Sequence, residues 1–237
     1  MIQCNDVVKK YISCTAVNHV TLTMEQGKVY TVLGPNGSGK STLMKIIVGL
    51  IEPNSGSVEL DGVRVGAKTK ANMVYMPTES YFYPYMKIKD IVKFEKDFYE
   101  DFSEDKFFEL LQNMHLDFND KVKNMSTGML AKLKLAVALA RNAKLVMLDE
   151  PLNGIDILAR ETIIEAIKAN VDGNRTFLLS SHLVDELEPI VDGAFFMRNG
   201  ELVLAGDSKE LTKDGKSLVE LYKEVYGYGG AAYGKAD

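Results

Sequence analysis

Short apolar runs alternate along the chain with longer segments in which apolar residues recur at helical spacing. The short runs are typical of buried strands. They are KVYTVLG (28–34), ANMVYMP (71–77), KLVMLDEP (144–151) and RTFLLSSH (175–182). Helices are predicted at 41–50, 124–141, 156–170 and 183–190, and one or two more at about 208–225. Strands that alternate with helices indicate a mostly parallel sheet covered by helices on both faces.

Hairpins and a long helical stretch interrupt this alternation. VTLTM (20–24) alternates apolar and polar positions, as a half-buried strand does. VELDGVRV (58–65) predicts a hairpin with Asp-Gly at its tip, and a second hairpin is predicted at Asn199-Gly200. The early segments indicate an antiparallel sheet beside the parallel one. The segment from about 79 to 140 is predicted to be a helical insertion.

The composition, 46% apolar and 26% charged over 237 residues, is that of an ordinary globular protein. We expect one domain over residues 1–237, with a low-complexity tail at about 227–237 that frays. A net charge of −5 and a pI near 5.4 argue against a nucleic-acid partner. Cys4 and Cys14 are expected to be reduced, in the cytosol. Because no apolar run approaches the roughly 20 residues that span a bilayer, work at a membrane would require a partner that holds the chain there.

A glycine-rich loop carries the most specific chemical signal in the chain. GPNGSGKS (34–41) matches G-x-x-x-x-G-K-[ST] and lies between a predicted strand and a predicted helix, which argues against a chance glycine turn. Its glycines let backbone N–H groups point at phosphates, Lys40 adds a positive charge, and the Ser41 hydroxyl is a hard ligand for Mg²⁺. The residues expected to contact the nucleotide are Asn36, Gly37, Ser38, Gly39, Lys40, Ser41 and Thr42.

Polar residues follow two of the predicted strands, at the sheet edge where ligands bind in parallel sheets. Asp149 suits a contact to Mg²⁺, and Glu150 suits a general base that polarises an attacking water. The alternative is a surface acidic pair that closes a strand. His182 ends the other strand and is expected to reach a γ-phosphate, the alternative being a solvated histidine. We expect His19 and His115 to be structural or exposed.

The helix predicted at 124–141 begins with a second anion-binding signal. Ser126 is the expected cap, and Gly128 opens the first turn. The unpaired N–H groups at such a helix start suit an anion. The glycine-rich loop, however, already supplies a phosphate site elsewhere in the chain.

Taken together, these motifs resemble the ATP-binding subunit of an ABC transporter over residues 1 to about 225. The motifs are the loop at 34–42, the signature at 125–129, LVMLDEP (145–151), NGID (153–156) and Ser-His at 181–182. The resemblance implies an α/β fold: a P-loop NTPase core with a mostly parallel sheet, an antiparallel β subdomain and an inserted helical subdomain. It also implies an ATPase that uses ATP and Mg²⁺.

The resemblance implies partners as well. Two ATP-binding subunits, identical or different, would pack head to tail, with Ser126 of one facing the γ-phosphate held by the other and Asp156 at the seam. A transmembrane permease subunit would hold the pair at the inner, cytoplasmic face of the membrane. The subgroup resembled suggests an exporter. Tyr11 would stack on the adenine, the alternative being an ordinary edge-strand aromatic residue.

Two motifs depart from the family pattern. Met125-Ser126-Thr127-Gly128-Met129 stands in place of Leu-Ser-Gly-Gly-Gln. Thr78 occupies the position of a glutamine that reaches towards Mg²⁺ and the attacking water, and its hydroxyl is too short to replace that side chain. We therefore expect hydrolysis to be slow.

The last open feature is an aromatic stretch after Thr78. Tyr81, Phe82, Tyr83 and Tyr85 form either a groove for a short helix of the permease or part of the packing of the insertion. Alternatives to the transporter subunit are a soluble ABC-type ATPase and a nucleotide-dependent regulator not coupled to transport.

Overall fold

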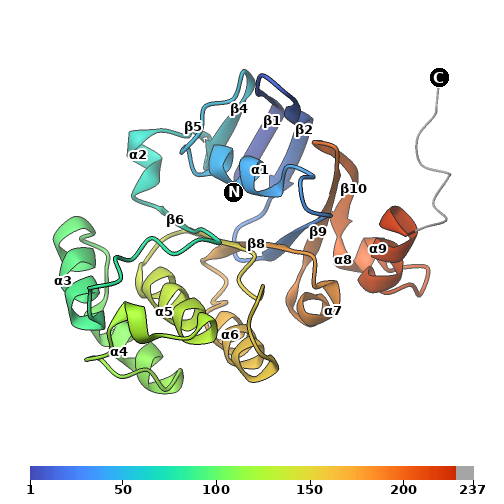
Figure 1. Cartoon of the computed structure of the whole chain (residues 1–237). Helices are drawn as coiled ribbons and strands as arrows, with labels where there is room; N and C mark the ends of the chain where they lie inside the picture. Colours follow the sequence, from blue (N-terminus) through green and yellow to red (C-terminus); the bar gives the residue numbers. More distant parts are fainter. Residues whose placement is uncertain (228–237) are drawn as a thin grey trace, which may run out of the picture.

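The computed structural model describes residues 1–227 (Figure 1), and residues 228–237, which make up nearly all of the tail expected to fray, lie outside the described residues. Within the described part, the main sheet has six strands in the order β10-β9-β3-β8-β7-β6. They are β3 (Val29–Leu33), β6 (Met73–Met76), β7 (Leu145–Asp149), β8 (Thr176–Ser181), β9 (Gly193–Arg198) and β10 (Glu201–Asp207). Neighbouring strands are parallel except in the β9–β10 hairpin, which turns at the predicted Asn199-Gly200. The prediction of a mostly parallel sheet is confirmed.

The antiparallel sheet, also within residues 1–227, has four strands in the order β2-β1-β4-β5. They are β1 (Ile2–Lys10), β2 (Thr15–Met24), β4 (Ser55–Leu60) and β5 (Val63–Arg64). The hydropathy pattern does not predict β1, because the alternation of apolar and polar residues is interrupted in the middle of the strand. The register shifts between Cys4 and Val7, where Asp6 has a φ of 51°, so both apolar residues are buried despite their odd spacing.

Helix α1 (Lys40–Ile47) lies between the two sheets (Figure 1). Its residues Leu43, Met44 and Ile47 are fully buried in a core with β1, β2 and β4 on one side and the main sheet on the other. The helix is shorter than predicted because Gly49, with a φ of 73°, turns the chain out of it. This sandwich fixes the glycine-rich loop, which joins β3 to α1.

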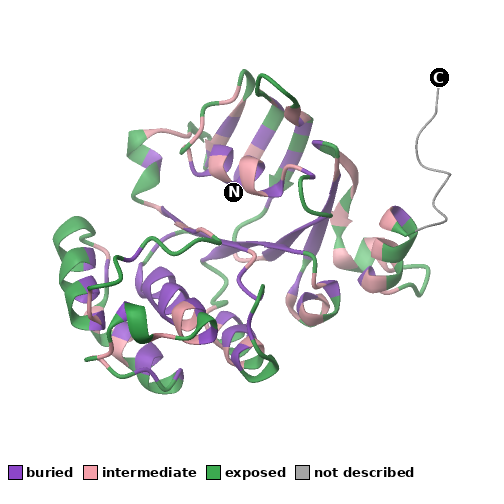
Figure 2. Ribbon diagram, viewed as in Figure 1, coloured by how far each residue is buried: buried purple, intermediate pink, exposed green. Residues whose placement is uncertain are grey.

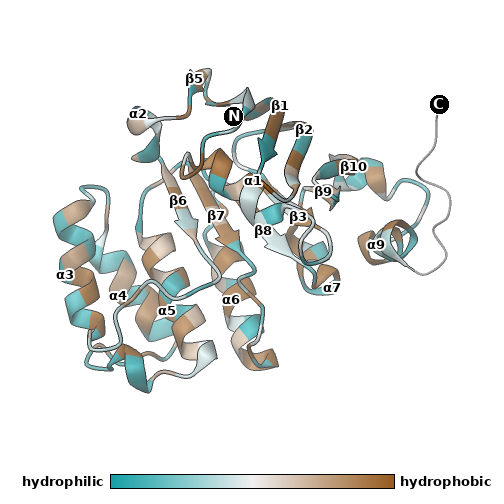
Figure 3. Cartoon of the chain, turned by 45° about the horizontal axis from the view of Figure 1, so that its top comes forward, coloured by the Kyte–Doolittle hydropathy of each residue, from teal (hydrophilic) through white to brown (hydrophobic). Residues whose placement is uncertain are grey.

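Helices cover the opposite face of the main sheet, and Figure 2 shows their buried sides turned towards the strands. The helical elements beyond α1 are α2 (Ala67–Lys70), α3 (Ile88–Phe98), α4 (Glu104–Asn113), η1 (Val122–Asn124), α5 (Thr127–Ala140), α6 (Ile157–Ala169), α7 (Val184–Leu187), η2 (Glu188–Ile190), α8 (Ser208–Leu211) and α9 (Leu218–Tyr226). The helix predicted at 183–190 is thus one α-turn and one 3₁₀-turn, with Pro189 at the start of the second. In Figure 3, which colours the ribbon by hydropathy, β7 is largely hydrophobic, whereas the helices carry both hydrophobic and hydrophilic residues.

The insertion predicted at 79–140 contains α3, α4 and α5, but α5 also belongs to the core. Its residues Leu133, Leu135 and Leu139 are fully buried, in one cluster with residues of both α4 and the main sheet. Any shift of α5 therefore displaces the insertion relative to the strands that carry the acidic residues.

Arg141, at the end of α5, ties the insertion to the edge of the sheet. Its Nε donates to Asp101 Oδ1 at 2.6 Å, and a terminal nitrogen donates to the Ala71 carbonyl at 3.2 Å. Its guanidinium also lies 3.6 Å from the centre of the Tyr99 ring. The side chain is buried, so these contacts replace its hydration.

We expect Arg141→Met to lower the free energy of unfolding by about 2–3 kcal/mol, because it leaves Asp101 and the Ala71 carbonyl without this donor. Urea denaturation monitored by circular dichroism measures the change. The matched control is Arg160→Met, which removes two contacts of a more exposed side chain, at 3.4 Å to Glu186 and at 3.2 Å to the Ile155 carbonyl, and should cost less than about 1 kcal/mol. Equal losses in the two variants would contradict the structural role given to Arg141.

Candidate functional site

The glycine-rich loop has a conformation that side chains would prevent. Gly34 and Gly39 have φ values of 156° and 107°. A Cβ on Gly34 would lie 2.4 Å from the Met197 carbonyl oxygen, and one on Gly39 would lie 2.2 Å from that of Ala16. Gly39 precedes α1 and offers no side-chain cap, so the first N–H groups of the helix have no side-chain partner there. The loop thus combines close backbone packing with a helix start suited to an anion.

Lys40 lies between this loop and the acidic end of β7. Its Nζ donates to the carbonyl oxygens of Gly34 at 2.7 Å and Pro35 at 3.2 Å. Glu150 Oε1 lies 3.5 Å from the same nitrogen. The ammonium group is buried, and these oxygens compensate its lost hydration.

Asp149, the last residue of β7, is only 2% exposed and is surrounded by hydroxyl groups. Its Oδ1 accepts from Ser41 at 3.1 Å and from Ser180 at 2.5 Å, and its Oδ2 accepts from Tyr75 at 2.8 Å. Its backbone oxygen accepts from the Thr78 hydroxyl at 3.2 Å. Ser41 and Asp149 therefore place two hard oxygens side by side, a donor set that fits Mg²⁺.

Tyr75 and Ser180 belong to this cluster, although no motif points to them. Both lie on strands that flank β7, and only the strand order β8-β7-β6 brings their side chains to Asp149. Burial, followed by the charge of Asp149, raises the pKa of the Tyr75 phenol. The phenol therefore stays protonated and remains a donor to the carboxylate.

Glu150 follows Asp149 with a φ of 49°, a left-handed conformation that is uncommon outside glycine. Its N–H donates to the Ser180 hydroxyl at 2.9 Å, which holds this conformation. Its Oε2 lies 2.9 Å from His182 Nδ1. The structure thus brings together Lys40, Glu150 and His182, three residues predicted from separate motifs, and backbone strain of this kind is often found at functional sites.

The predicted start of α5 is observed, and it is exposed. Ser126 Oγ accepts from the Met129 N–H at 3.2 Å. Asp156 caps the adjacent α6 by accepting from Ala159 N at 2.9 Å, and a Cβ on Gly128 would lie 3.3 Å from Asp156 Oδ2. The start of α5 at Ser126, called here the Ser126 tip, thus packs beside the NGID loop. The residues around Lys40, in contrast, directly follow the ends of β3, β7 and β8.

Tyr11 lies in the turn between β1 and β2 and is exposed, with Lys9 Nζ 5.5 Å from the centre of its ring. His19 is also exposed, and its Nδ1 lies 2.7 Å from Asp6 Oδ1. Of the three histidines, only His182 lies at the predicted phosphate site; His19 and His115 do not contact it. The exposed Tyr11 ring remains free to stack on a flat ligand.

The aromatic stretch is partly buried and partly exposed. Phe82 is buried in the core, whereas Tyr81, Tyr83 and Tyr85 are 45%, 62% and 73% exposed. Tyr81 lies at a cavity of about 670 Å³ between β6, α3 and α5. Phe98 and Tyr99 line the same cavity, as does the buried Glu95, whose pKa is raised to about 7 by burial.

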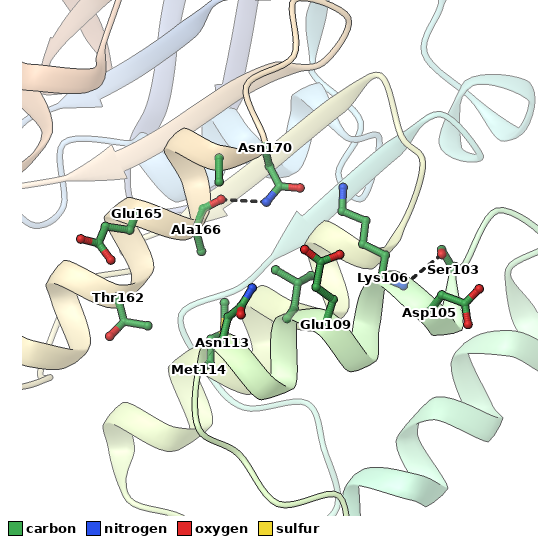
Figure 4. A pocket seen from close by; sticks show the side chains of 12 residues that line it. Ser103, Asp105, Lys106, Glu109, Asn113, Met114, Thr162, Glu165, Ala166 and Asn170 are labelled. Carbon is green, nitrogen blue, oxygen red and sulfur yellow. Dashed lines mark hydrogen bonds between the residues drawn. The ribbon is translucent and has the colours of Figure 1, made fainter.

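A cavity of about 690 Å³ opens elsewhere, between α4 and α6 (Figure 4). Its lining includes Lys106, Glu109, Glu165 and Asn170. None of the residues predicted to contact phosphate or metal lines it, so it is separate from the candidate nucleotide site. Within residues 1–227, no helix is both long enough and apolar enough to cross a membrane.

Comparisons with known proteins agree with this geometry. A sequence model of the ABC transporter family matches residues 17–153, more than half of the chain. The lantibiotic transport ATP-binding protein SrtF of Streptococcus pyogenes is 32% identical over 206 residues, which are 86% of this chain and 90% of that protein. The ABC transporter ATP-binding protein YtrB of Bacillus subtilis (strain 168) is 29% identical over 217 residues, 90% of this chain and 74% of that protein.

Solved structures share the fold. A structure of the ATP-binding subunit of an ABC transporter has a TM-score of 0.85 at 26% identity and covers 95% of this chain and 99% of its own. A dimeric ATP-binding cassette bound to ADP and Pi has a TM-score of 0.78 at 23% identity, over 87% of this chain and 98% of its own. The chain therefore belongs to the ABC transporter family, as an ATP-binding and ATP-hydrolysing subunit of a transporter.

Proposed function

We propose that this single-domain chain hydrolyses ATP with Mg²⁺ at the edge formed by the glycine-rich loop, β7 and β8, and that hydrolysis drives export through a separate permease. The observation that carries the proposal is the convergence of Lys40, Ser41, Asp149, Glu150 and His182 at one sheet edge. Such an arrangement supplies phosphate binding, metal ligation and a general base within one site.

Each residue then has a distinct role. The loop N–H groups and Lys40 bind the phosphates, and Ser41 with Asp149 holds Mg²⁺, which neutralises phosphate charge when bound. Glu150 takes a proton from the attacking water, while His182, 2.9 Å from it, orients its carboxylate and contacts the γ-phosphate. Tyr11 stacks on the adenine.

The exposed Ser126 tip supports a head-to-tail dimer. Its contacts are with the NGID loop and not with its own glycine-rich loop, so its free N–H groups are available to a second subunit. We propose that they bind the γ-phosphate held by that subunit, with Gly128 allowing close approach and Asp156 at the seam. Dimerisation would complete two sites, because each tip serves the other subunit's nucleotide.

Slow hydrolysis follows from the two departures from the family pattern. The Thr78 hydroxyl already donates to the Asp149 backbone oxygen and extends no further towards the attacking water. Met129 offers no side-chain amide beside the tip. The site therefore lacks two polar groups that would position water and phosphate.

The cavity lined by Tyr81, Phe98 and Tyr99 is the proposed docking surface for a short cytoplasmic segment of the permease. This contact would hold the chain at the inner face of the membrane. Exposed aromatic side chains around an apolar cavity suit an amphipathic helix.

The direction of transport, export, is supported by two relatives. They are the lantibiotic transport ATP-binding protein SrtF and the linearmycin resistance ATP-binding protein LnrL of Bacillus subtilis (strain 168), the latter 28% identical.

Glu150→Gln should reduce ATP turnover at least about 100-fold while leaving ATP binding intact, because the amide cannot accept the proton from water. With saturating ATP and Mg²⁺ the variant should elute from a size-exclusion column as a stable dimer. Glu165→Gln, an exposed change on α6, is the control and should behave as the parent protein does. A Glu150→Gln variant that hydrolyses ATP normally would refute the assignment of the base.

Met129→Gln should raise kcat by about threefold to tenfold, equivalent to about 0.7–1.4 kcal/mol, because it restores an amide beside the γ-phosphate of the dimer. Steady-state hydrolysis at saturating ATP measures this. Lys132→Gln, one turn further along the same helix, should leave kcat unchanged. An unchanged kcat in Met129→Gln would show that the signature residue does not limit turnover.

Phe98→Glu should lower the fraction of the chain that sediments with membranes of cells containing its permease by about tenfold, the effect of losing one interface anchor. The reason is that a carboxylate would be placed against an apolar partner surface. ATP hydrolysis by the isolated chain should not change. The control is Val63→Glu, an exposed apolar position on β5 that lies outside the cavity; release by the control to the same extent would argue against the proposed docking surface.

A further inference from the structure

Lys134 is a lysine in the interior of α5, and it is only 6% exposed. Its neighbours along the helix, Leu133 and Leu135, are fully buried. An ammonium group taken out of water is strongly destabilising unless nearby oxygens replace its hydration. The contacts of Lys134 Nζ therefore indicate what this side chain holds in place.

Those contacts are two backbone carbonyls in the segment that leaves β6. Lys134 Nζ donates to the Pro77 oxygen at 2.8 Å and to the Thr78 oxygen at 2.7 Å. Both distances are those of well-formed, charge-assisted hydrogen bonds. The lysine thus fixes the position of two consecutive peptide groups relative to α5.

The same segment is joined to the end of β7. The Thr78 hydroxyl donates to the backbone oxygen of Asp149, and Tyr75, three residues earlier, donates to the Asp149 carboxylate. A continuous series of hydrogen bonds therefore runs from Lys134 through residue 78 to the chain immediately before Glu150. Helix α5 itself begins after Ser126, its N-cap residue.

The charges around Lys134 are few. Burial lowers the pKa of its ammonium group, and the acidic groups of Glu79 and Asp149 act in the opposite direction. Among the described residues, no hydrogen bond or ion pair joins Lys134 to Lys40 or to the glycine-rich loop; Lys40 Nζ instead contacts Gly34, Pro35 and Glu150. Its influence on the nucleotide is therefore indirect, through the position of the backbone.

We propose that Lys134 is a positioning residue for ATP hydrolysis: it holds the segment Pro77–Thr78 against α5, so that the Asp149–Glu150 strand end and the Ser126 tip keep a fixed relative position. The proposal rests on the roles proposed above for Asp149, Glu150 and Ser126. It assigns to a lysine on α5 part of the positioning that Thr78 is too short to provide. Because Lys134 does not touch the nucleotide, it affects kcat and not ATP affinity.

The test uses Lys134→Met, Thr78→Val and the double variant, with Lys132→Met as the control on the same helix. Lys134→Met keeps the length of the side chain but removes the donors; Thr78→Val removes only the link to Asp149. We expect each to lower kcat roughly 10- to 100-fold, the scale of a misplacement of about 1 Å, with KM and ATP affinity within about twofold of the parent values. Lys132→Met should match the parent protein.

The double variant separates positioning from a general loss of stability. If both residues act through one series of hydrogen bonds, the double variant should lose no more activity than the worse single variant, whereas independent effects would multiply. Multiplying effects, an unchanged kcat in Lys134→Met, or a parallel loss of ATP affinity would overturn the proposal.

Folding and the catalytic assignment are checked separately. Circular dichroism and binding of a fluorescent ATP analogue establish that each variant is folded, and Lys134→Gln, which retains a donor, replaces the methionine variant should that one not fold. Glu150→Gln is assayed in parallel. Loss of turnover in Glu150→Gln with normal turnover in the Lys134 variants would reject the role of Lys134 alone, whereas normal turnover in Glu150→Gln would reject the proposed catalytic site itself.

Discussion

Asp149 is almost completely buried, although its carboxylate would be stabilised by several kcal/mol more in water than in an apolar interior. The fold offsets this cost with hydroxyl groups from three different elements: Ser41 on α1, Tyr75 on β6 and Ser180 on β8. The carboxylate can be accommodated only where those three elements meet. The order of the strands and the placement of α1 between the sheets are therefore coupled to the chemistry of one side chain, and the neighbouring Glu150 is positioned by the same constraint.

The motifs could be predicted because each is local in the sequence. A glycine-rich loop, an acidic strand end and a capped helix each depend on a few consecutive residues, and their elements are observed where the pattern places them. Tyr75, Ser180 and Lys134 could not be identified in this way. Their contacts depend on which strands are neighbours and which helix covers them, and apolar periodicity does not specify either. Strand β1 is not predicted for a local reason. The left-handed conformation of Asp6 shifts the alternation of buried and exposed residues along the strand.

The starts of α1 and α5 both suit an anion, but the first is enclosed by the rest of the chain and the second is exposed. The start of α1 is enclosed by β3, β7 and β8, with Lys40 and Asp149 both buried. The start of α5 is exposed at Ser126 and is supported from behind by the cap of α6, where Gly128 leaves room for Asp156. A rigid but exposed helix start is suited to a ligand brought by another molecule. This contrast is the structural basis for proposing that the second start serves a nucleotide held by a second subunit.

A buried ammonium group contributes little to stability compared with an apolar side chain of similar volume, so the presence of Lys134 is not explained by folding alone. Its hydrogen bonds are directional. By donating to two carbonyl oxygens at 2.7–2.8 Å, Lys134 fixes one backbone segment against the helix more specifically than apolar packing does. The segment it fixes is the one that leaves β6 beside Asp149, and the helix that carries Lys134 begins after Ser126. Apolar residues between α5 and the segment after β6 could slide and repack, and would hold the two elements less rigidly. A polar contact that costs stability at this junction is therefore explained by a requirement for constant geometry between them.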